Sequence, residues 1–200
     1  MLIKKVKAKK IKNSRNQETI KVILKSDNGK FEASAPSGSS VGEHEVRAIS
    51  KKGISYSVDF VNKTLSKELK DFEFNEFDDF KKIENLIKKY DDSENIELVG
   101  GNTIVALEFA ILKAVSNGKI WKFLNPKIKQ VPRPLGNCIG GGKHSKKRIK
   151  SDVQEFLLFS LNAKSYSDAV NANKKIHLAL EKELKTQWRA LNKWNQLSIL

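Results

Sequence analysis

The order of the hydrophobic patterns along the chain constrains its fold more than any other feature. Apolar and polar residues alternate in three segments near the N-terminus, at 2–11, 19–25 and 31–35, as in strands that bury one face. Asp27-Asn28-Gly29, between the second and third segments, is a hairpin turn signal. Because the three segments follow one another closely, we expect an antiparallel meander.

Helical spacing replaces this alternation further along the chain. Apolar residues recur three and four positions apart from Phe60 to Leu69 and from Phe80 to Tyr90, which predicts two amphipathic helices. A third helix is expected from about Thr103 to Ser116; it is apolar on most sides and stops at Gly118. Three strands followed by helices predict an α+β domain.

Prolines mark the expected domain boundary. Asn125-Pro126 and Pro132-Arg133-Pro134 interrupt the periodic segments, and such residues are typical of linkers. We therefore predict an α+β domain over 1–125, a linker over 126–134 and a second region over 135–200.

A glycine-rich, basic stretch lies in the second region, between strands expected at about 135–140 and 153–160. Gly140-Gly141-Gly142 is followed by His144 and then by several lysines and arginines. Glycines permit a close approach of other groups to the backbone, but such a connection is often only a turn. It is not a phosphate-binding P-loop, because it lacks the GKS or GKT ending. A helix should follow, with Ser165 as its N-cap and Asp168 as the capping partner.

Composition excludes several classes of protein. With 39% hydrophobic and 30% charged residues, the chain is typical of a globular protein and not of a disordered one. No apolar run is long enough for a membrane span, and the N-terminal MLIKKVKAKK lacks the apolar core of a signal peptide. The single cysteine, Cys138, fits a reducing compartment and is expected to be a small packed residue. We therefore expect a cytoplasmic protein without a membrane partner.

The net charge of +15 is the unusual number in the composition. Such a charge attracts anionic partners, either a phosphorylated small molecule or nucleic acid. The lysines are spread along the whole chain, however, and no nucleic-acid-binding motif is recognisable. We favour a lysine-rich solvated surface over nucleic-acid binding.

Two separate segments resemble one known family. GGGKHS and VQEFLLF, within 140–159, are similar to the GG-x-H…QEF segment of enolases, and 36–45 (PSGSSVGEHE) is similar to the family's PSGASTG-x-x-E loop. Ser14-Arg15 and Gly100-Gly101-Asn102 resemble shorter stretches of the same family. On these residues the chain is identified as a relative of archaeal-type enolases (phosphopyruvate hydratases), similar to their N-terminal portion.

This resemblance implies a fold and a reaction. The fold would be an enolase-like N-terminal α+β domain, followed by the first ββα part of an incomplete TIM-type barrel. The reaction would be the dehydration of 2-phosphoglycerate to phosphoenolpyruvate in glycolysis, catalysed by a homodimeric, cytoplasmic lyase with two Mg²⁺ ions at its complete site. Mg²⁺ in such sites stabilises the ene-diolate.

The resemblance also implies roles for individual residues. His144 and Glu155 would be catalytic, and together with Gln154 and Lys143 they would contact the substrate. Ser40 would be a ligand of the second Mg²⁺. Val41 replaces the family's threonine in this loop.

A complete barrel needs roughly 250 residues, and the resemblance ends near Lys185. The family's three Mg²⁺-binding carboxylates and its lysine base lie later in the barrel, so we expect the 200-residue chain alone to be inactive. We also expect an uncovered apolar face and unpaired sheet edges. Two interpretations stay open: an enolase whose coding region is interrupted, or a non-catalytic module for dimerisation or for anionic partners.

Overall fold

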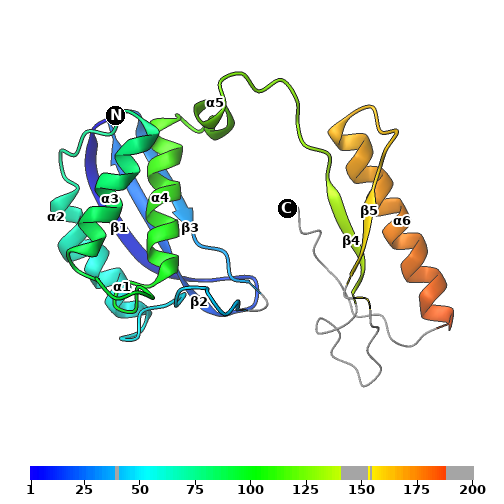
Figure 1. Ribbon diagram of the computed structural model, residues 1–200, viewed down its shortest axis with the longest axis horizontal. Coiled ribbons are helices and arrows are strands. Elements are labelled where there is room, and N and C mark those ends of the chain that lie inside the picture. The colour runs from blue at the N-terminus through cyan, green and yellow to red at the C-terminus, as the bar shows by residue number, and fades with distance from the viewer. Residues whose placement is uncertain (39–40, 141–152, 154, 188–200) are drawn as a thin grey trace. The chain divides into compact units, whose positions relative to one another are not determined.

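The computed structural model describes residues 1–38, 41–140, 153 and 155–187. The chain divides into two compact units, Met1–Ile128 and Lys129–Leu200, and each is described by itself (Figure 1). The predicted domain limits, at 1–125, 126–134 and 135–200, stay a prediction.

The sheet of the first unit confirms the predicted meander. Strands β1 (Ile3–Lys12), β2 (Glu18–Ser26) and β3 (Gly29–Ser34) are antiparallel, in the order β1-β2-β3. In the register, Val6 lies opposite Leu24 and Ala8 opposite Val22. These four side chains are buried, so one face of the sheet forms the floor of the hydrophobic core.

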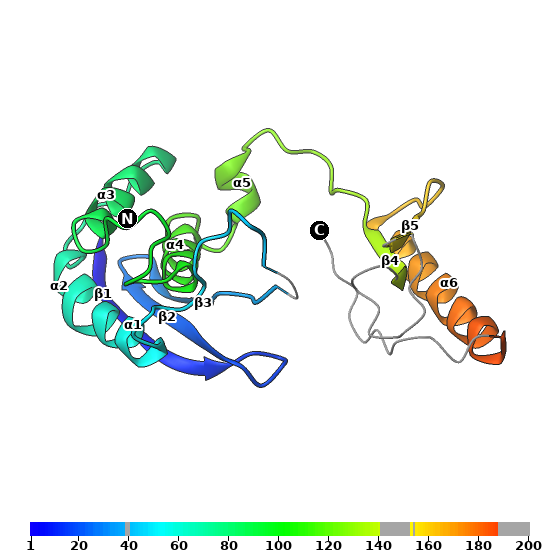
Figure 2. The ribbon, with the colours of Figure 1, turned by 60° about the horizontal axis from the view of Figure 1, so that its bottom comes forward.

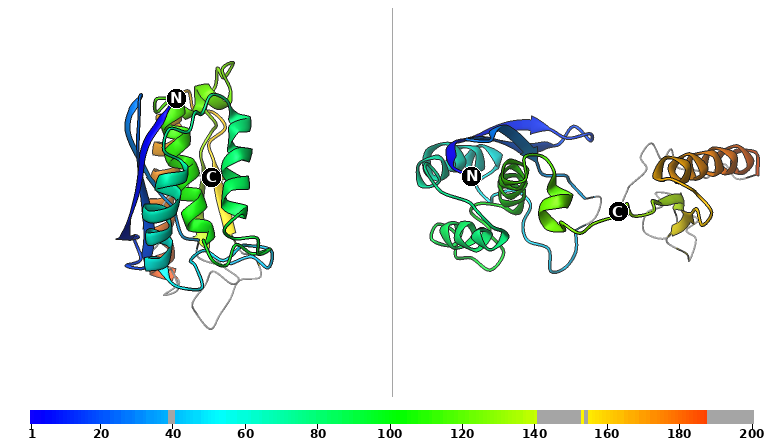
Figure 3. Two further views of the ribbon diagram at one scale, coloured as in Figure 1. Left: turned by 90° about the vertical axis from the view of Figure 1, so that its left-hand side faces the viewer. Right: turned by 90° about the horizontal axis from the view of Figure 1, so that it is seen from above.

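Helices cover that face and leave the other one open (Figure 3, right). The longest, α4 (Gly101–Val115), packs on β2 and β3 and buries Leu107 and Ile111 completely. The remaining elements of this unit are α1 (Ile54–Phe60), the π-helix η1 (Val61–Leu65), α2 (Ser66–Glu68), the 3₁₀-helix η2 (Phe77–Asp79), α3 (Phe80–Lys88) and α5 (Ile120–Leu124).

The predicted helix from Phe60 to Leu69 is only partly right. Helical structure begins earlier, at Ile54, and contains the π-helical turn η1. This turn brings Asn62 to the free edge of β1, where its side chain accepts from Ala8 N at 2.8 Å and donates to Ala8 O at 3.1 Å. A side-chain amide thus takes the place of a neighbouring strand, and covered edges resist pairing with other chains.

Asn117 and Gly118 end α4 in the way that the sequence predicts for Gly118. Asn117 has a φ of +47° and donates to Ala114 O, and Gly118 N donates to Lys113 O at 2.8 Å. This is the Schellman pattern, in which a left-handed residue closes the helix. The left-handed residue directly after the cap is Asn117, one position before the predicted stop.

Asp79 makes the stability of the first unit sensitive to pH in the acidic range. Its carboxylate accepts from Lys82 Nζ at 2.5 Å and from the backbone N–H groups of Asn75 and Glu76 at 2.8 and 3.1 Å. The Lys82 hydrogen bond and the two backbone donors lower the pKa of Asp79 from 3.8 to about 2. Because the folded state holds the lower pKa, this stabilisation is present above pH 4 and is lost as the pH falls toward 2.

We therefore expect Asp79→Asn to destabilise the protein at pH 6 and to make little difference near pH 2. Urea unfolding of both proteins across this range measures the effect, with Asp78→Asn, which removes the exposed pairing with Lys81, as the control. A difference between wild type and Asp79→Asn that does not change with pH would contradict this assignment.

The second unit has the expected strand, strand, helix order. Strands β4 (Leu135–Gly140) and β5 (Glu155–Phe159) form an antiparallel pair, and α6 (Tyr166–Gln187) lies alongside them (Figure 2). Ser165 Oγ accepts from Asp168 N at 3.1 Å, which confirms the predicted N-cap. With the meander, this arrangement confirms the α+β class and has the ββα order expected for the start of a barrel; the part that the structure describes forms no closed barrel.

Apolar side chains of the second unit remain uncovered, as expected. Phe156 and Phe159 on β5 are 46% and 49% exposed, and Ile176 and Leu178 on α6 are 45% and 52% exposed. Among the residues that the structure describes, no helix is long and apolar enough to span a membrane.

Candidate functional site

The turn between β1 and β2 positions the start of the loop that the sequence singles out. Asn13 Oδ1 accepts from Arg15 N and from Gln17 N, both at 2.9 Å, and Asn16 has a φ of +61°. Asn tolerates this left-handed conformation, so the turn forms here without a glycine. The turn directs Arg15 Nη1 to Gly38 O at 2.7 Å, directly before the two serines of the loop.

The other end of this loop is held by the N-terminus of α4. Gly101 N donates to Arg47 O at 2.8 Å, and Asn102 N donates to Ala48 O at 2.9 Å. A Cβ on Gly100 would lie 2.6 Å from Ser50 N, so only glycine allows the helix to approach the 46–50 segment this closely. The loop is therefore held at its start by an arginine side chain and after its end by backbone hydrogen bonds.

In the second unit, the predicted site lies at one end of the β4–β5 hairpin. Gly140 and Glu155 form the last pair of the ladder, so the chain from 141 to 154 leaves and returns at this pair. Glu155 is partly buried. A strand end of this kind fixes the backbone of a carboxylate at the point where a long connection ends.

The rest of the hairpin supports this end. Asn173 on α6 is buried and donates from Nδ2 to Pro134 O at 3.2 Å and to Leu158 O at 3.4 Å. Gly136 permits this approach, because a Cβ there would lie 3.2 Å from Asn173 Nδ2. The helix is thus tied to the main chain beside both strands. None of these contacts was predicted from the sequence.

Cys138 is a packed residue, as the sequence analysis expects. Its side chain is 7% exposed and its Sγ lies 2.9 Å from Phe156 O. Burial raises the pKa of the thiol above its ordinary value, which disfavours the thiolate needed for nucleophilic chemistry.

Most of the predicted site residues lie outside the described residues. These are Ser40, Lys143, His144 and Gln154; of the predicted site residues, the structure describes Glu155. Ser40 belongs to the first unit and the others to the second. Their roles therefore stay predictions. Within the described part of the chain, no three His, Cys, Asp or Glu side chains are grouped to hold a metal ion.

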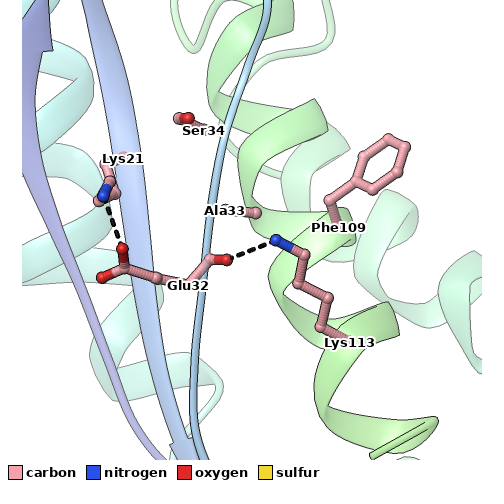
Figure 4. A pocket seen from close by; sticks show the side chains of 6 residues that line it. All are labelled: Lys21, Glu32, Ala33, Ser34, Phe109 and Lys113. Atoms are coloured by element: carbon pink, nitrogen blue, oxygen red, sulfur yellow. Dashed lines mark hydrogen bonds and ion pairs between the residues drawn. The ribbon is translucent and has the colours of Figure 1, made fainter. Parts of the chain in front are cut away.

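Two hollows of the first unit were not predicted. One, of about 290 Å³, lies at the β3 edge, where Lys21 pairs with Glu32 and Lys113 Nζ donates to Glu32 O at 2.8 Å (Figure 4). The other, of about 340 Å³, lies between α3 and α4 and contains Glu84 and Glu108. Burial, and then the charge of Glu84, raise the pKa of Glu108. Both hollows depend on how α4 packs against its neighbours, which no local sequence pattern specifies.

Comparison with known proteins identifies both units. Residues 3–124 match the family described as "Enolase, N-terminal domain", and residues 127–194 match "Enolase, C-terminal TIM barrel domain". The second match reaches position 194, so the prediction that the resemblance ends near Lys185 is wrong. An abrupt end there is therefore no longer an argument for an interrupted coding region.

Several archaeal enolases are similar over most of this chain. The enolase of Methanothermobacter thermautotrophicus is 36% identical over 180 residues, which cover 88% of this chain and 42% of that protein. The enolases of Methanosphaera stadtmanae and Thermoplasma acidophilum are each 33% identical, over 92% and 88% of this chain and 44% and 43% of their own length. The chain thus spans less than half the length of these relatives.

Proposed function

The chain belongs to the enolase family, and from this premise we propose that its sequence serves the dehydration of 2-phosphoglycerate to phosphoenolpyruvate. One observation carries the proposal: both enolase domains are matched in the family's order, with only two residues between the matched ranges. Family membership supports a lyase; the substrate and the glycolytic role are the proposal.

In this proposal the β4–β5 hairpin supplies the substrate side of the site. Glu155 hydrogen-bonds the departing hydroxyl group or its water, and His144 positions the phosphorylated ligand. Gln154 contacts the substrate, and the Lys143 ammonium attracts its phosphate. The pairing of Gly140 with Glu155 supports this assignment. The connection that carries the other three residues begins after Gly140 and ends at the carboxylate.

Mg²⁺ belongs to the proposed complete site, where it would stabilise the negative charge of the ene-diolate. Ser40 would contribute one oxygen ligand. Mg²⁺ needs near-octahedral oxygen coordination, normally including carboxylates, and the described residues hold no suitable group. The described residues therefore do not fit Mg²⁺ on their own, and we assign no step to it here. A cytoplasmic location and a homodimer are further parts of the proposal.

A chimaera tests the function directly. Residues 1–187 would be joined to the barrel segment of the Methanothermobacter thermautotrophicus enolase that follows its matched region, since the two proteins are 36% identical there. We expect this protein to form phosphoenolpyruvate from 2-phosphoglycerate with Mg²⁺ and to stop when a chelator is added. The 200-residue chain alone should be silent under both conditions.

The two proteins, the chimaera and the 200-residue chain, test different parts of the proposal. A chimaera that folds cooperatively but shows no turnover, beside an active parent enolase, would overturn the proposed function. Chelator-sensitive turnover by the 200-residue chain alone would overturn the assignment of essential metal ligands to the later barrel.

A second candidate function is a non-catalytic module for anionic partners. It is favoured by one observation, the concentration of lysines on the uncovered face of the β1–β3 sheet. Such a module needs no barrel, so binding by the 200-residue chain separates it from catalysis.

A further inference from the structure

Lysines are the most frequent residues on the uncovered face of the first sheet. The register places every second residue of each strand on this face. Five of its lysines are exposed and a sixth, Lys21, is partly exposed. We call these six residues the lysine face: Lys5, Lys7, Lys9, Lys21, Lys25 and Lys30. With Glu32 as its acidic member, the face holds a third of the chain's net charge of +15.

Strand pairing places these charges directly beside one another. Lys25 lies between Lys5 and Lys30, and Lys9 lies opposite Lys21. Side chains opposite each other have Cβ atoms roughly 5 Å apart, and like charges at such positions are destabilising. The arrangement therefore costs folding stability, and a bound polyanion would remove that cost.

Glu32 offsets the charge only at one end of the face. Its carboxylate lies 2.6 Å from Lys21 Nζ (Figure 4). The hydrogen bond from Lys21 and the charges of Lys21, Lys9 and Lys30 lower the pKa of Glu32, as expected if these cations share one surface. Within the described residues, no ion pair forms at Lys5, Lys7, Lys9, Lys25 or Lys30.

We propose that the lysine face binds the phosphate backbone of double-stranded nucleic acid without sequence preference. The inference deepens the second candidate function and is independent of the dehydration reaction. Lys5, Lys7 and Lys9 follow β1 at intervals of roughly 7 Å, and the strands lie about 5 Å apart. A duplex carries one charge per roughly 1.7 Å of its axis, so a short stretch supplies enough phosphates for the whole face.

The remaining side chains favour a duplex over other polyanions. The outward positions of the three strands hold no aromatic residue, whereas single strands are bound largely by stacking on aromatic rings. Ile11 and Ile23 on this face are only partly exposed, whereas proteins that insert into a membrane surface present large apolar side chains. An open sheet face also suits an extended phosphate backbone better than a small phosphate compound, which is usually bound in a concave pocket.

The test compares two triple variants of the 200-residue chain with equal net charge. One is Lys5→Gln, Lys7→Gln and Lys9→Gln on the lysine face. The other is Lys67→Gln, Lys88→Gln and Lys89→Gln, all exposed on the helical layer. Binding to a duplex of about 20 base pairs is measured by fluorescence anisotropy at several salt concentrations, after urea unfolding has shown that both variants fold.

We expect a wild-type slope of log K against log salt near −4, because each neutralised phosphate contributes about −0.9. The lysine-face variant should lose about 3 units of this slope and roughly 100-fold in affinity near 0.1 M salt. The helical-layer variant should keep the slope within about one unit and the affinity within about a factor of three. Glu32→Gln, which releases Lys21, should bind more tightly than wild type.

Three outcomes would overturn the proposal. The first is an equal loss in both triple variants, which would reflect net charge alone. The second is no measurable duplex binding by the wild type. The third is tighter binding to vesicles of phosphatidylcholine and phosphatidylserine than to the duplex, which would assign the face to a membrane surface. Sedimentation of each variant separates a change of oligomeric state from a change of binding.

Discussion

Replacing Glu155 by Gln in the active chimaera should lower kcat/KM for 2-phosphoglycerate by roughly 10²- to 10⁴-fold, the usual contribution of a positioned acid–base group. The change keeps the size of the side chain and removes only its charge and its ability to exchange a proton. Glu155 is the first residue of β5 and pairs with Gly140, so the backbone should stay in place. His144→Ala should cause a loss of similar size.

Unfolding curves and a matched substitution distinguish chemistry from stability. Glu84→Gln, at an exposed position of α3 outside the proposed site, is the control and should leave kcat/KM unchanged. All three variants should unfold at the urea concentration of the parent chimaera. Turnover close to the parent value in either Glu155→Gln or His144→Ala would contradict the assigned roles, whatever the stability of the variant.

The sheet could be predicted because its residues follow a local pattern. Val6, Ala8, Val22 and Leu24 alternate with polar residues and all face the core, so a pattern of period two is sufficient. The same holds for the helices that bury one side, and for Ser165, whose capping role depends on a residue only three positions away. The family assignment succeeded for a different reason. Short motifs can be matched in the sequence without any knowledge of how the chain packs.

What could not be predicted depends on residues far apart in the chain. Asn62 bonds to Ala8, and Arg15 reaches Gly38, but a polar side chain carries no sign of a distant backbone partner. The π-helical turn at Val61–Leu65 carries Asn62 to the edge of β1, a partner that the local pattern does not indicate. Likewise, alternation places Lys5, Lys7 and Lys9 on one face of β1, but only the register with β2 and β3 brings the lysines of those strands beside them.

Gly100→Ala should destabilise the first unit by about 4 kcal/mol, which places it among the severe single substitutions. Gly100 is the N-cap of α4 and has a φ of +82°, a region that costs an L-residue about 1–3 kcal/mol. The added Cβ would also lie 2.6 Å from Ser50 N and 2.9 Å from Ile49 C. Both atoms belong to the backbone, so relief requires the 46–50 segment to move.

Gly53 provides a matched control for this substitution. It is the N-cap of α1, with a φ of +87°, and a Cβ there would meet nothing within 4 Å. Gly53→Ala therefore reports the conformational cost alone, about 1–3 kcal/mol, and urea unfolding of both variants isolates the effect of the clash. Equal losses would show that the contact between α4 and the 46–50 segment is not close.

The position of Gly100 also links this loss of stability to the proposed function. The 46–50 segment follows the loop that carries Ser40, and the backbone of α4 holds it through Arg47 and Ala48. Displacing that segment should disturb the loop even where the fold survives. In the chimaera at low temperature, Gly100→Ala should thus lower turnover while Gly53→Ala does not. Equal turnover in a folded Gly100→Ala protein would show that the contact of α4 with the 46–50 segment does not affect the loop.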